Sequence, residues 1–306
     1  MTGEAIVELS EEVAAAKAAG RGIVALESTI ITHGLPWPQN LEVAEAVEAT
    51  VRQRGAVPAT IAVIAGRVHA GLSHDEIVAL AQADDCLKLS RADLAYAVAK
   101  QRNGSTTVAA TMIVARLAGI SVFATGGIGG VHKGASESFD ISADLEELAR
   151  TEVTVVAAGA KAILDLPKTL EYLETKGVPV VGWGTDEFPA FWSRASGLPV
   201  PLRLDTADEF ADFVAARRRL GTTGGIFVAN PIPPEFEISR EAIEAVIAEA
   251  VADAQAAGIK GKQVTPYLLS RMFDLTEGRS LVANRALILN NAALAADLAK
   301  AIAARG

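Results

Sequence analysis

The sequence predicts an α/β fold, in which helices cover both faces of a mainly parallel β-sheet and a helical region forms the C-terminal part. Three observations support this prediction. Short apolar runs alternate with helix-like segments along most of the chain. Half of the 306 residues are apolar and 21% are charged, which is enough to build a sizeable core. From residue 239 onward the pattern is helical throughout, and we expect one domain over residues 1–306.

Six apolar runs are expected to form the buried strands of this sheet. Each run is short and ends close to glycine or polar residues, which is typical of strands in α/β proteins. The runs span residues 22–28, 58–66, 120–125, 153–159, 178–184 and 224–230. Between residues 66 and 71 the chain is expected only to turn.

The helices are predicted from their start and stop signals. Ser73 and Glu76 have the spacing of a capping box, and Pro167 suits the first turn of a helix. Asn40 and Ser90 are expected to cap the helices that follow them. The expected helices span residues 11–20, 41–55, 73–83, 90–100, 105–119, 144–150, 166–177, 206–221, 239–258, 265–278 and 280–306.

Composition and charge exclude several classes of function. The net charge of −9 and a pI of about 5.1 argue against binding to a nucleic-acid backbone. Cys86 is the one cysteine, so no internal disulfide forms, which fits a reducing compartment. The first residues lack a signal-peptide pattern, and no run of about 18 apolar residues indicates a membrane span. We therefore expect a cytoplasmic protein with no membrane partner.

Most of the reactive side chains lie between residues 125 and 161. A glycine-rich segment, residues 126–130, follows a predicted strand, and His132 and Lys133 come next. A polar loop, a helix and a further strand then lead to Lys161. Because ligands of open α/β sheets bind beyond the carboxyl ends of the strands, we expect the functional site here.

The glycine-rich segment has two interpretations. Its backbone amides could cradle a phosphate, with His132 and Lys133 pairing with the negative charge. Alternatively it is a tight turn, since neither a dinucleotide-binding nor a Walker pattern is present. Lys88, after a short apolar run, could likewise bind phosphate or lie on the surface.

Glu27 and Lys161 each follow an apolar run that reads as a buried strand. A buried carboxyl holds its proton more tightly, so Glu27 would suit a proton donor, or it could form a structural pair. A desolvated lysine amine is more readily neutral and can attack a carbonyl to form a Schiff base. The alternative for Lys161 is a side chain that reaches solvent.

Asp140, Ser142 and Asp144 alternate along the polar loop. Their oxygens suit a hard divalent cation such as Mg²⁺ or Mn²⁺, with waters completing the coordination. Alternatively, Ser142 caps the helix that follows and Asp144 lies in its first turn.

Taken together, the chain resembles the pseudouridine-5′-phosphate glycosidase family over nearly its whole length. The similar segments occur in the order ALESTIITHGLPWPQN, PATIAVIAGRVHAGLS, KLSRADL, GSTTVAATM, ATGGIGGVHKG, SFDISADL, AGAKAILDLPKTLE, TPYLLSRM and GRSLVAN. The resemblance implies α/β/α layers, a homotrimer, and one divalent metal ion, Mn²⁺, per subunit. It also implies a lyase of nucleotide catabolism that reversibly cleaves pseudouridine 5′-phosphate to uracil and ribose 5-phosphate.

The resemblance also assigns roles to individual residues. Lys161 would be the nucleophile, Glu27 the proton donor and Asp140 the metal ligand. The residues expected to bind the substrate are Lys88, Val108, His132, Ser142, Ala143, Asp144 and Asn284.

The residues agree with the chemistry that this reaction needs. A C–C glycosidic bond has no heteroatom to protonate, so the two carboxylates of an ordinary glycosidase do not suffice. A lysine can capture C1′ of the ring-opened sugar as an imine, and Glu27 can deliver a proton to C5 of uracil. Two other classes remain open: a Schiff-base aldolase or lyase acting on a sugar phosphate, and a non-catalytic sugar-phosphate-binding protein.

Overall fold

The computed structural model describes residues 6–259 and 264–305, so both ends of the predicted domain 1–306 lie outside the described residues. The described part contains one sheet of eleven strands. The strands are β1 (Val7–Leu9), β2 (Ile23–Leu26), β3 (Val57–Ile64), β4 (Arg67–Ala70), β5 (Leu87–Leu89), β6 (Gly104–Thr106), β7 (Val122–Ala124), β8 (Thr154–Ala157), β9 (Val180–Trp183), β10 (Leu202–Leu204) and β11 (Ile226–Ala229).

The strand order confirms the predicted α/β class. The order is β1-β4-β3-β2-β7-β8-β11-β9-β10, with β6 also pairing with β3 and β5 pairing with β6. The six predicted strands form the consecutive run β3-β2-β7-β8-β11-β9 at the centre of this order. Neighbouring strands within this run pair in parallel. The strands that were not predicted are short and lie at the periphery, where apolar runs are too brief to be distinctive.

The expectation of a simple turn over residues 66–71 was wrong. This segment contains β4, which pairs antiparallel with β3 in a hairpin. Ala65 and Gly66 join the strands, and both have positive φ, 48° and 79°. A type I′ hairpin turn requires this conformation at both central positions, and alanine rarely adopts it, which explains why the hairpin was missed.

Most helices follow the predicted segments with shifts of a few residues, but three short ones, at residues 29–33, 135–138 and 234–236, were not predicted. They are α1 (Glu11–Ala18), α2 (Thr29–His33), α3 (Gln39–Gln53), α4 (His74–Ala81), α5 (Leu94–Ala99), α6 (Val108–Ala118), α7 (Ala135–Ser138), α8 (Ala143–Arg150), α9 (Leu166–Thr175), α10 (Ala207–Leu220), the 3₁₀ helix η1 (Pro234–Phe236), α11 (Arg240–Ala256), α12 (Val264–Leu275) and α13 (Arg279–Ala303). Ser90 does not cap α5, which begins after Asp93.

Two cap predictions have opposite outcomes. The capping box of Ser73 and Glu76 is present at the start of α4. Asn40, in contrast, lies inside α3 and does not cap it. Its side-chain amide donates to the carbonyls of Ile31, at 2.7 Å, and Ala81, at 2.8 Å, so it ties α3 to α2 and α4.

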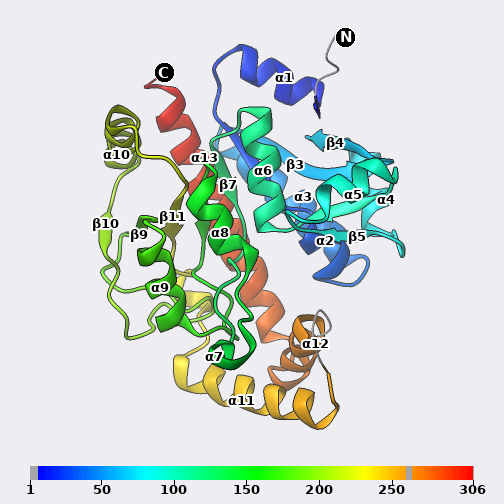
Figure 1. Ribbon diagram of the computed structural model, residues 1–306, viewed down its shortest axis with the longest axis vertical. Helices are drawn as coiled ribbons and strands as arrows, with labels where there is room; N and C mark the ends of the chain where they lie inside the picture. The colour runs from blue at the N-terminus through cyan, green and yellow to red at the C-terminus, as the bar shows by residue number, and fades with distance from the viewer. Residues whose placement is uncertain (1–5, 260–263, 306) are drawn as a thin grey trace.

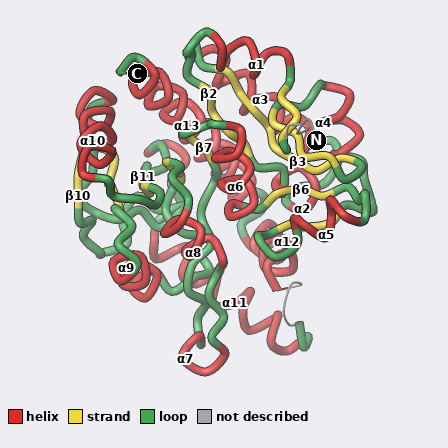
Figure 2. Tube along the Cα trace, turned by 45° about the horizontal axis from the view of Figure 1, so that its top comes forward, coloured by secondary structure: helices red, strands yellow, loops and turns green. Residues whose placement is uncertain are grey.

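Helices cover both faces of the sheet, as predicted. Apolar side chains of α3, α10 and α13 pack on one face, and those of α1, α6, α8 and α9 pack on the other. Figure 1 shows α6 and α8 in front of β7 while α13 runs behind it. In Figures 1 and 2, α7 lies at the end of the molecule opposite the C-terminus.

Helix α13 is the long central helix of the fold. Of the helices in residues 6–259 and 264–305, it alone is long and apolar enough to cross a membrane by length and composition. Its most apolar stretch of 18 residues is 56% buried. The helix packs against α3, α10, β2, β7 and β8. The apolar side chains of α13 are therefore part of the protein core.

Candidate active site

A cavity opens at the carboxyl ends of β2 and β7 and holds the predicted catalytic residues. It encloses about 1020 Å³ of space, open solvent included. Glu27, Lys88, Lys161 and Asn284 all line it, although they come from four distant segments of the chain. The parallel strands β2 and β8 bring Glu27 and Lys161 together, because these strands end at the same edge of the sheet. Lys88 reaches the cavity from β5, whose partner β6 pairs antiparallel with β3.

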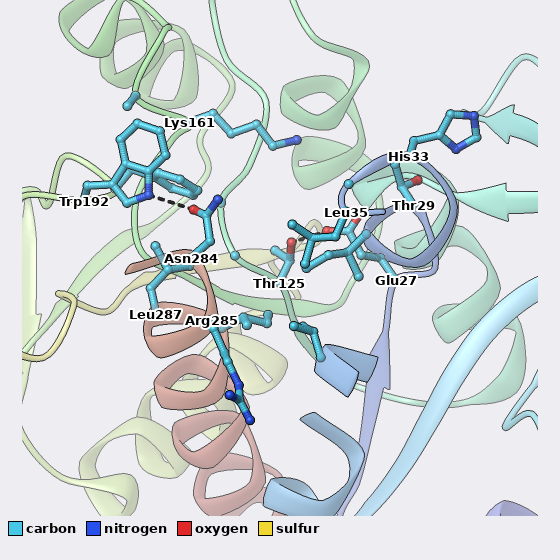
Figure 3. Close-up of a pocket in the computed structure, with 18 of the residues that line it drawn as sticks. Glu27, Thr29, His33, Leu35, Thr125, Lys161, Trp192, Asn284, Arg285 and Leu287 are labelled. Atoms are coloured by element: carbon cyan, nitrogen blue, oxygen red, sulfur yellow. Dashed lines mark hydrogen bonds between the residues drawn. The ribbon is translucent and has the colours of Figure 1, made fainter. Parts of the chain in front are cut away.

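Glu27 directly follows β2 and is held by Thr125, which follows β7. The Thr125 hydroxyl donates a hydrogen bond to Oε1 of Glu27 (Figure 3). Part of the Glu27 side chain faces the cavity. Burial of the carboxyl group raises the pKa of Glu27 above its usual value, and this effect outweighs the nearby charge of Lys161, which lowers the pKa. The Thr125 carbonyl in turn accepts a hydrogen bond from Asn291 of α13, at 2.9 Å. Glu27 therefore keeps its proton at a higher pH than an ordinary glutamate does.

Lys161 is positioned by the loop that follows β8. Its backbone N–H donates to the carbonyl of Ile128, and its own carbonyl accepts from Leu164, both at 3.0 Å. These two bonds fix the backbone on both sides of the lysine. Figure 3 shows its amine pointing across the cavity toward Thr29 and His33.

Lys88 lies on β5 beside the start of α6. It is opposite Ser105 of β6, and β6 leads directly into α6 through the N-cap residue Thr107. Val108 is the first residue of α6, and its side chain is 1% exposed and packs in the core. A ligand could therefore contact Val108 only through its backbone, and its substrate-binding role stays a prediction.

Ser142 and Asp144 have structural roles in this region. Ser142 caps α8 by accepting from the Asp144 N–H at 3.3 Å, as one of the two interpretations predicted. Asp144 is 6% exposed, and its carboxylate accepts from the N–H groups of Ala109, at 2.9 Å, and Gly129, at 2.8 Å. It therefore joins the start of α6 to the glycine-rich loop. Ala143, between the two, is exposed.

Part of the glycine-rich loop is bonded within the protein, whereas Gly126 and Gly127 line the cavity. The N–H groups of Ile128, Gly129 and Val131 all donate to groups inside the protein, so these amides are not available to a ligand. The glycines allow close packing instead: a Cβ on Gly127 would lie 2.6 Å from the ring of Phe191. The tight-turn interpretation therefore fits Ile128 and Gly129, and phosphate binding by the other amides of the loop stays a prediction.

His132 and Asp140 lie together on the polar loop. Nδ1 of His132 is 3.9 Å from Oδ2 of Asp140, whose side chain is 64% exposed. Neither residue lines the cavity. Within the described residues, no three His, Cys, Asp or Glu side chains are grouped so that they could hold a metal ion. The exposed Asp140 carboxylate nevertheless fits a single protein ligand of a hard divalent cation that keeps most of its waters.

Several cavity residues were missed by the sequence analysis. Trp192, in the loop after β9, donates from its indole N–H to Oδ1 of Asn284 at 2.7 Å. Thr29 and His33 come from α2, a helix that was not predicted. Burial, and then the charge of Lys88, lower the pKa of His33 below its usual value. The rule that loops after parallel strands carry the site could have identified Trp192.

Comparison with known proteins gives a consistent result. A family model described as "Indigoidine synthase A like protein" matches residues 12–301. A pseudouridine-5′-phosphate glycosidase of Methylobacterium nodulans is 63% identical over 297 residues, 97% of this chain and 88% of the relative. A protein of the same name from Paracoccus denitrificans is 62% identical over 300 residues, 97% of this chain and 99% of the relative.

Two solved structures are similar over nearly the full chain. The prealnumycin C-glycosynthase AlnA, in complex with ribulose 5-phosphate, has a TM-score of 0.92 and 39% identity, and each chain is covered to 99%. An indigoidine synthase A-like protein from Thermotoga maritima has a TM-score of 0.89 and 33% identity, covering 99% of this chain and 98% of the other.

Proposed function

The chain belongs to the indigoidine synthase A-like protein family, and from this premise we propose that it is a pseudouridine-5′-phosphate glycosidase. The reaction is the reversible cleavage of the C–C glycosidic bond of pseudouridine 5′-phosphate to uracil and ribose 5-phosphate. The names of the relatives at 62% and 63% identity support it. The observation that carries the proposal is the presence of Lys161 and Glu27 in one cavity, with Lys88 beside them.

Lys161 supplies the nucleophile. Its neutral amine attacks C1′ while the C1′–O4′ bond breaks and O4′ takes up a proton, which opens the sugar ring. The nitrogen lone pair then forms a C1′=N bond as the C–C bond to the base breaks, so the electrons of that bond pass to C5 of uracil. Water hydrolyses the imine, which releases ribose 5-phosphate and restores the lysine.

Glu27 supplies the proton that C5 of uracil needs when the C–C bond breaks. A general acid at neutral pH requires a raised pKa, and burial raises the pKa of Glu27 in this structure. The hydrogen bond from Thr125 keeps the carboxyl group on the cavity side of β2. In the direction of synthesis, the resulting carboxylate removes the proton from C5.

The phosphate is proposed to bind next to Lys88. The N-terminus of α6 follows the strand that pairs with Lys88, and the helix dipole favours an anion there, although the Ala109 N–H already donates to Asp144. In this arrangement the backbone N–H of Val108 contacts the phosphate, which agrees with its buried side chain.

Asp140 is proposed to hold one Mn²⁺ ion, with His132 beside it. When bound, the ion would supply positive charge and ordered waters. The exposed carboxylate suits an ion that keeps several waters.

A homotrimer in the cytoplasm is proposed for the assembled enzyme. Phe139 and Leu220 are exposed to 80% and 78%, and contacts between copies would bury such apolar side chains.

The direct test is incubation of the protein with pseudouridine 5′-phosphate, with Mn²⁺ or with a chelator, and detection of uracil by chromatography. We expect metal-dependent release of uracil, abolished in Lys161→Ala and retained in Lys168→Ala, an exposed lysine of α9 that pairs with Asp165. An active Lys161→Ala variant would refute the role of the lysine.

Borohydride treatment separates the alternatives. The proposed enzyme should be trapped as an adduct of ribose 5-phosphate on Lys161. An aldolase would be trapped by its own sugar phosphate without releasing uracil, and a binding protein would show neither reaction.

A further inference from the structure

One end of the cavity has the character of a site for a flat heterocycle. Its walls are apolar and are formed by Phe191, Trp192, Leu268, Met272 and Leu287. Asn284 is a polar side chain bonded to Trp192, and Lys88 and Lys161 line the same cavity. Figure 3 shows Arg285 pointing along α13, away from Asn284. If the protein has the proposed function, the base binds at this end of the cavity and the two lysines contact the sugar phosphate.

The orientation of the Asn284 amide is fixed by Trp192. An indole N–H can only donate, so the atom of Asn284 that lies 2.7 Å from it must be the oxygen. The amide nitrogen, with its two N–H groups, is therefore the part left for a ligand. Asn284 thus presents hydrogen-bond donors to the base, and Oδ1 keeps one further lone pair.

Trp192 cannot easily move to accommodate a different amide orientation. Its side chain is 1% exposed, and its ring meets that of Phe191 edge to face, with centroids 5.1 Å apart. The backbone on each side is also held: the Phe191 N–H donates to Ala158, and the Trp192 carbonyl accepts from Ile238, both at 2.9 Å. Turning the Asn284 amide around would place its NH₂ group against a buried indole N–H, which would then lack an acceptor.

We infer that Trp192 is a positioning residue that makes the enzyme selective for a base with a carbonyl group facing Asn284, and against a base with an amino group there. This inference rests on the proposed function and extends it to the choice of base. A pyrimidine carbonyl accepts from the Asn284 N–H groups. An exocyclic amino group would place a donor against a donor, and the hydrogen bond from Trp192 prevents the amide from turning to correct this.

The test compares the wild-type protein with Trp192→Phe, which keeps an aromatic ring and removes the N–H donor together with part of the indole ring. The substrates are pseudouridine 5′-phosphate and its two analogues in which an amino group replaces the C2 or the C4 carbonyl. We expect the wild type to discriminate in kcat/KM against at least one analogue. Trp192→Phe should reduce this discrimination by roughly 5- to 150-fold, the factor that corresponds to one buried donor without an acceptor. Trp183→Phe, at the end of β9 and outside this cavity, should leave the discrimination unchanged.

A purely structural role for Trp192 predicts another result. In that case Trp192→Phe would lower kcat/KM for all three substrates by the same factor, and this outcome overturns the inference.

Binding of the free bases separates this inference from the proposed function. Uracil and cytosine are compared by ligand-observed NMR, which needs no turnover. If the wild type releases no uracil but binds uracil in preference to cytosine, and Trp192→Phe loses that preference, the inference stands and the proposed reaction fails. If neither assay shows discrimination by the wild type, the inference is wrong.

Discussion

Replacing Asp144 with asparagine removes the charge from a buried group that connects two parts of the active site. Its two oxygens accept from Ala109, at the start of α6, and from Gly129 in the glycine-rich loop, at 2.9 and 2.8 Å. An asparagine has one oxygen, so its NH₂ group would face one of these two N–H groups. One buried amide therefore loses its acceptor in Asp144→Asn.

The expected loss of stability follows from these contacts. A hydrogen bond to a charged acceptor contributes about 1.5–3 kcal/mol, and a carboxylate at a helix N-terminus contributes about 0.3–1 kcal/mol. We therefore expect Asp144→Asn to lower the free energy of unfolding by about 2–4 kcal/mol. Such a loss is a large fraction of the stability of a typical domain.

The assay is urea-induced unfolding followed by circular dichroism, with a chelator present so that bound metal does not contribute. Asp140→Asn is the matched control, because it makes the same chemical change on an exposed carboxylate, and it should change the free energy of unfolding by less than about 0.5 kcal/mol. If Asp144→Asn unfolds like the control but raises KM, then Asp144 binds the substrate and the structural argument is wrong.

Three further predictions concern other parts of the site. Burial raises the pKa of Glu27 in the folded protein above its pKa in the unfolded chain. The contribution of the protonated carboxyl group to stability is therefore complete below the pKa of the unfolded chain, and it is lost as the pH rises through the pKa of the folded protein. The Tm of Glu27→Gln should therefore rise relative to that of the wild type as the pH increases, which calorimetry at several pH values can measure, and the variant should no longer release uracil. A difference in Tm that does not change with pH would contradict this. Gly127→Ala should raise KM, because the new Cβ would lie 2.6 Å from the ring of Phe191 and displace it; an unaltered KM would mean that this ring does not bound the site. Asp140→Ala should remove the activation by Mn²⁺ in a uracil-release assay, and full activation would place the metal elsewhere.

The sequence was sufficient for the fold class and for the centre of the sheet. The six predicted strands are apolar and buried, so their local pattern reflects their environment directly. Ligands of parallel sheets bind beyond the carboxyl ends of the strands, which predicted Glu27 and Lys161 at one edge of the sheet. In the structure both residues line one cavity. The predicted roles of these two residues came from the resemblance to a family, and they remain to be tested by mutation.

Other features depended on contacts between distant segments. The strands β5 and β6 form where β6 pairs with β3, and neither of them is an apolar run, so their sequences carry no clear strand signal. Asn40 looked like a helix cap, but its side chain is taken by two carbonyls from other helices. A polar side chain goes to whichever partner the fold places beside it, and sequence spacing does not show that partner.

The candidate active site also has features that the sequence determined and features that only the tertiary structure decided. The sequence by itself determined which chemical groups are available, because a lysine and a glutamate at strand ends can be read from the local pattern. Only the tertiary structure decided that Asp144 supports the glycine-rich loop and that Trp192 fixes the amide of Asn284, 92 residues away along the chain. Hydrogen-bond geometry over such separations is set by how the helices pack on the sheet, and no local pattern encodes it.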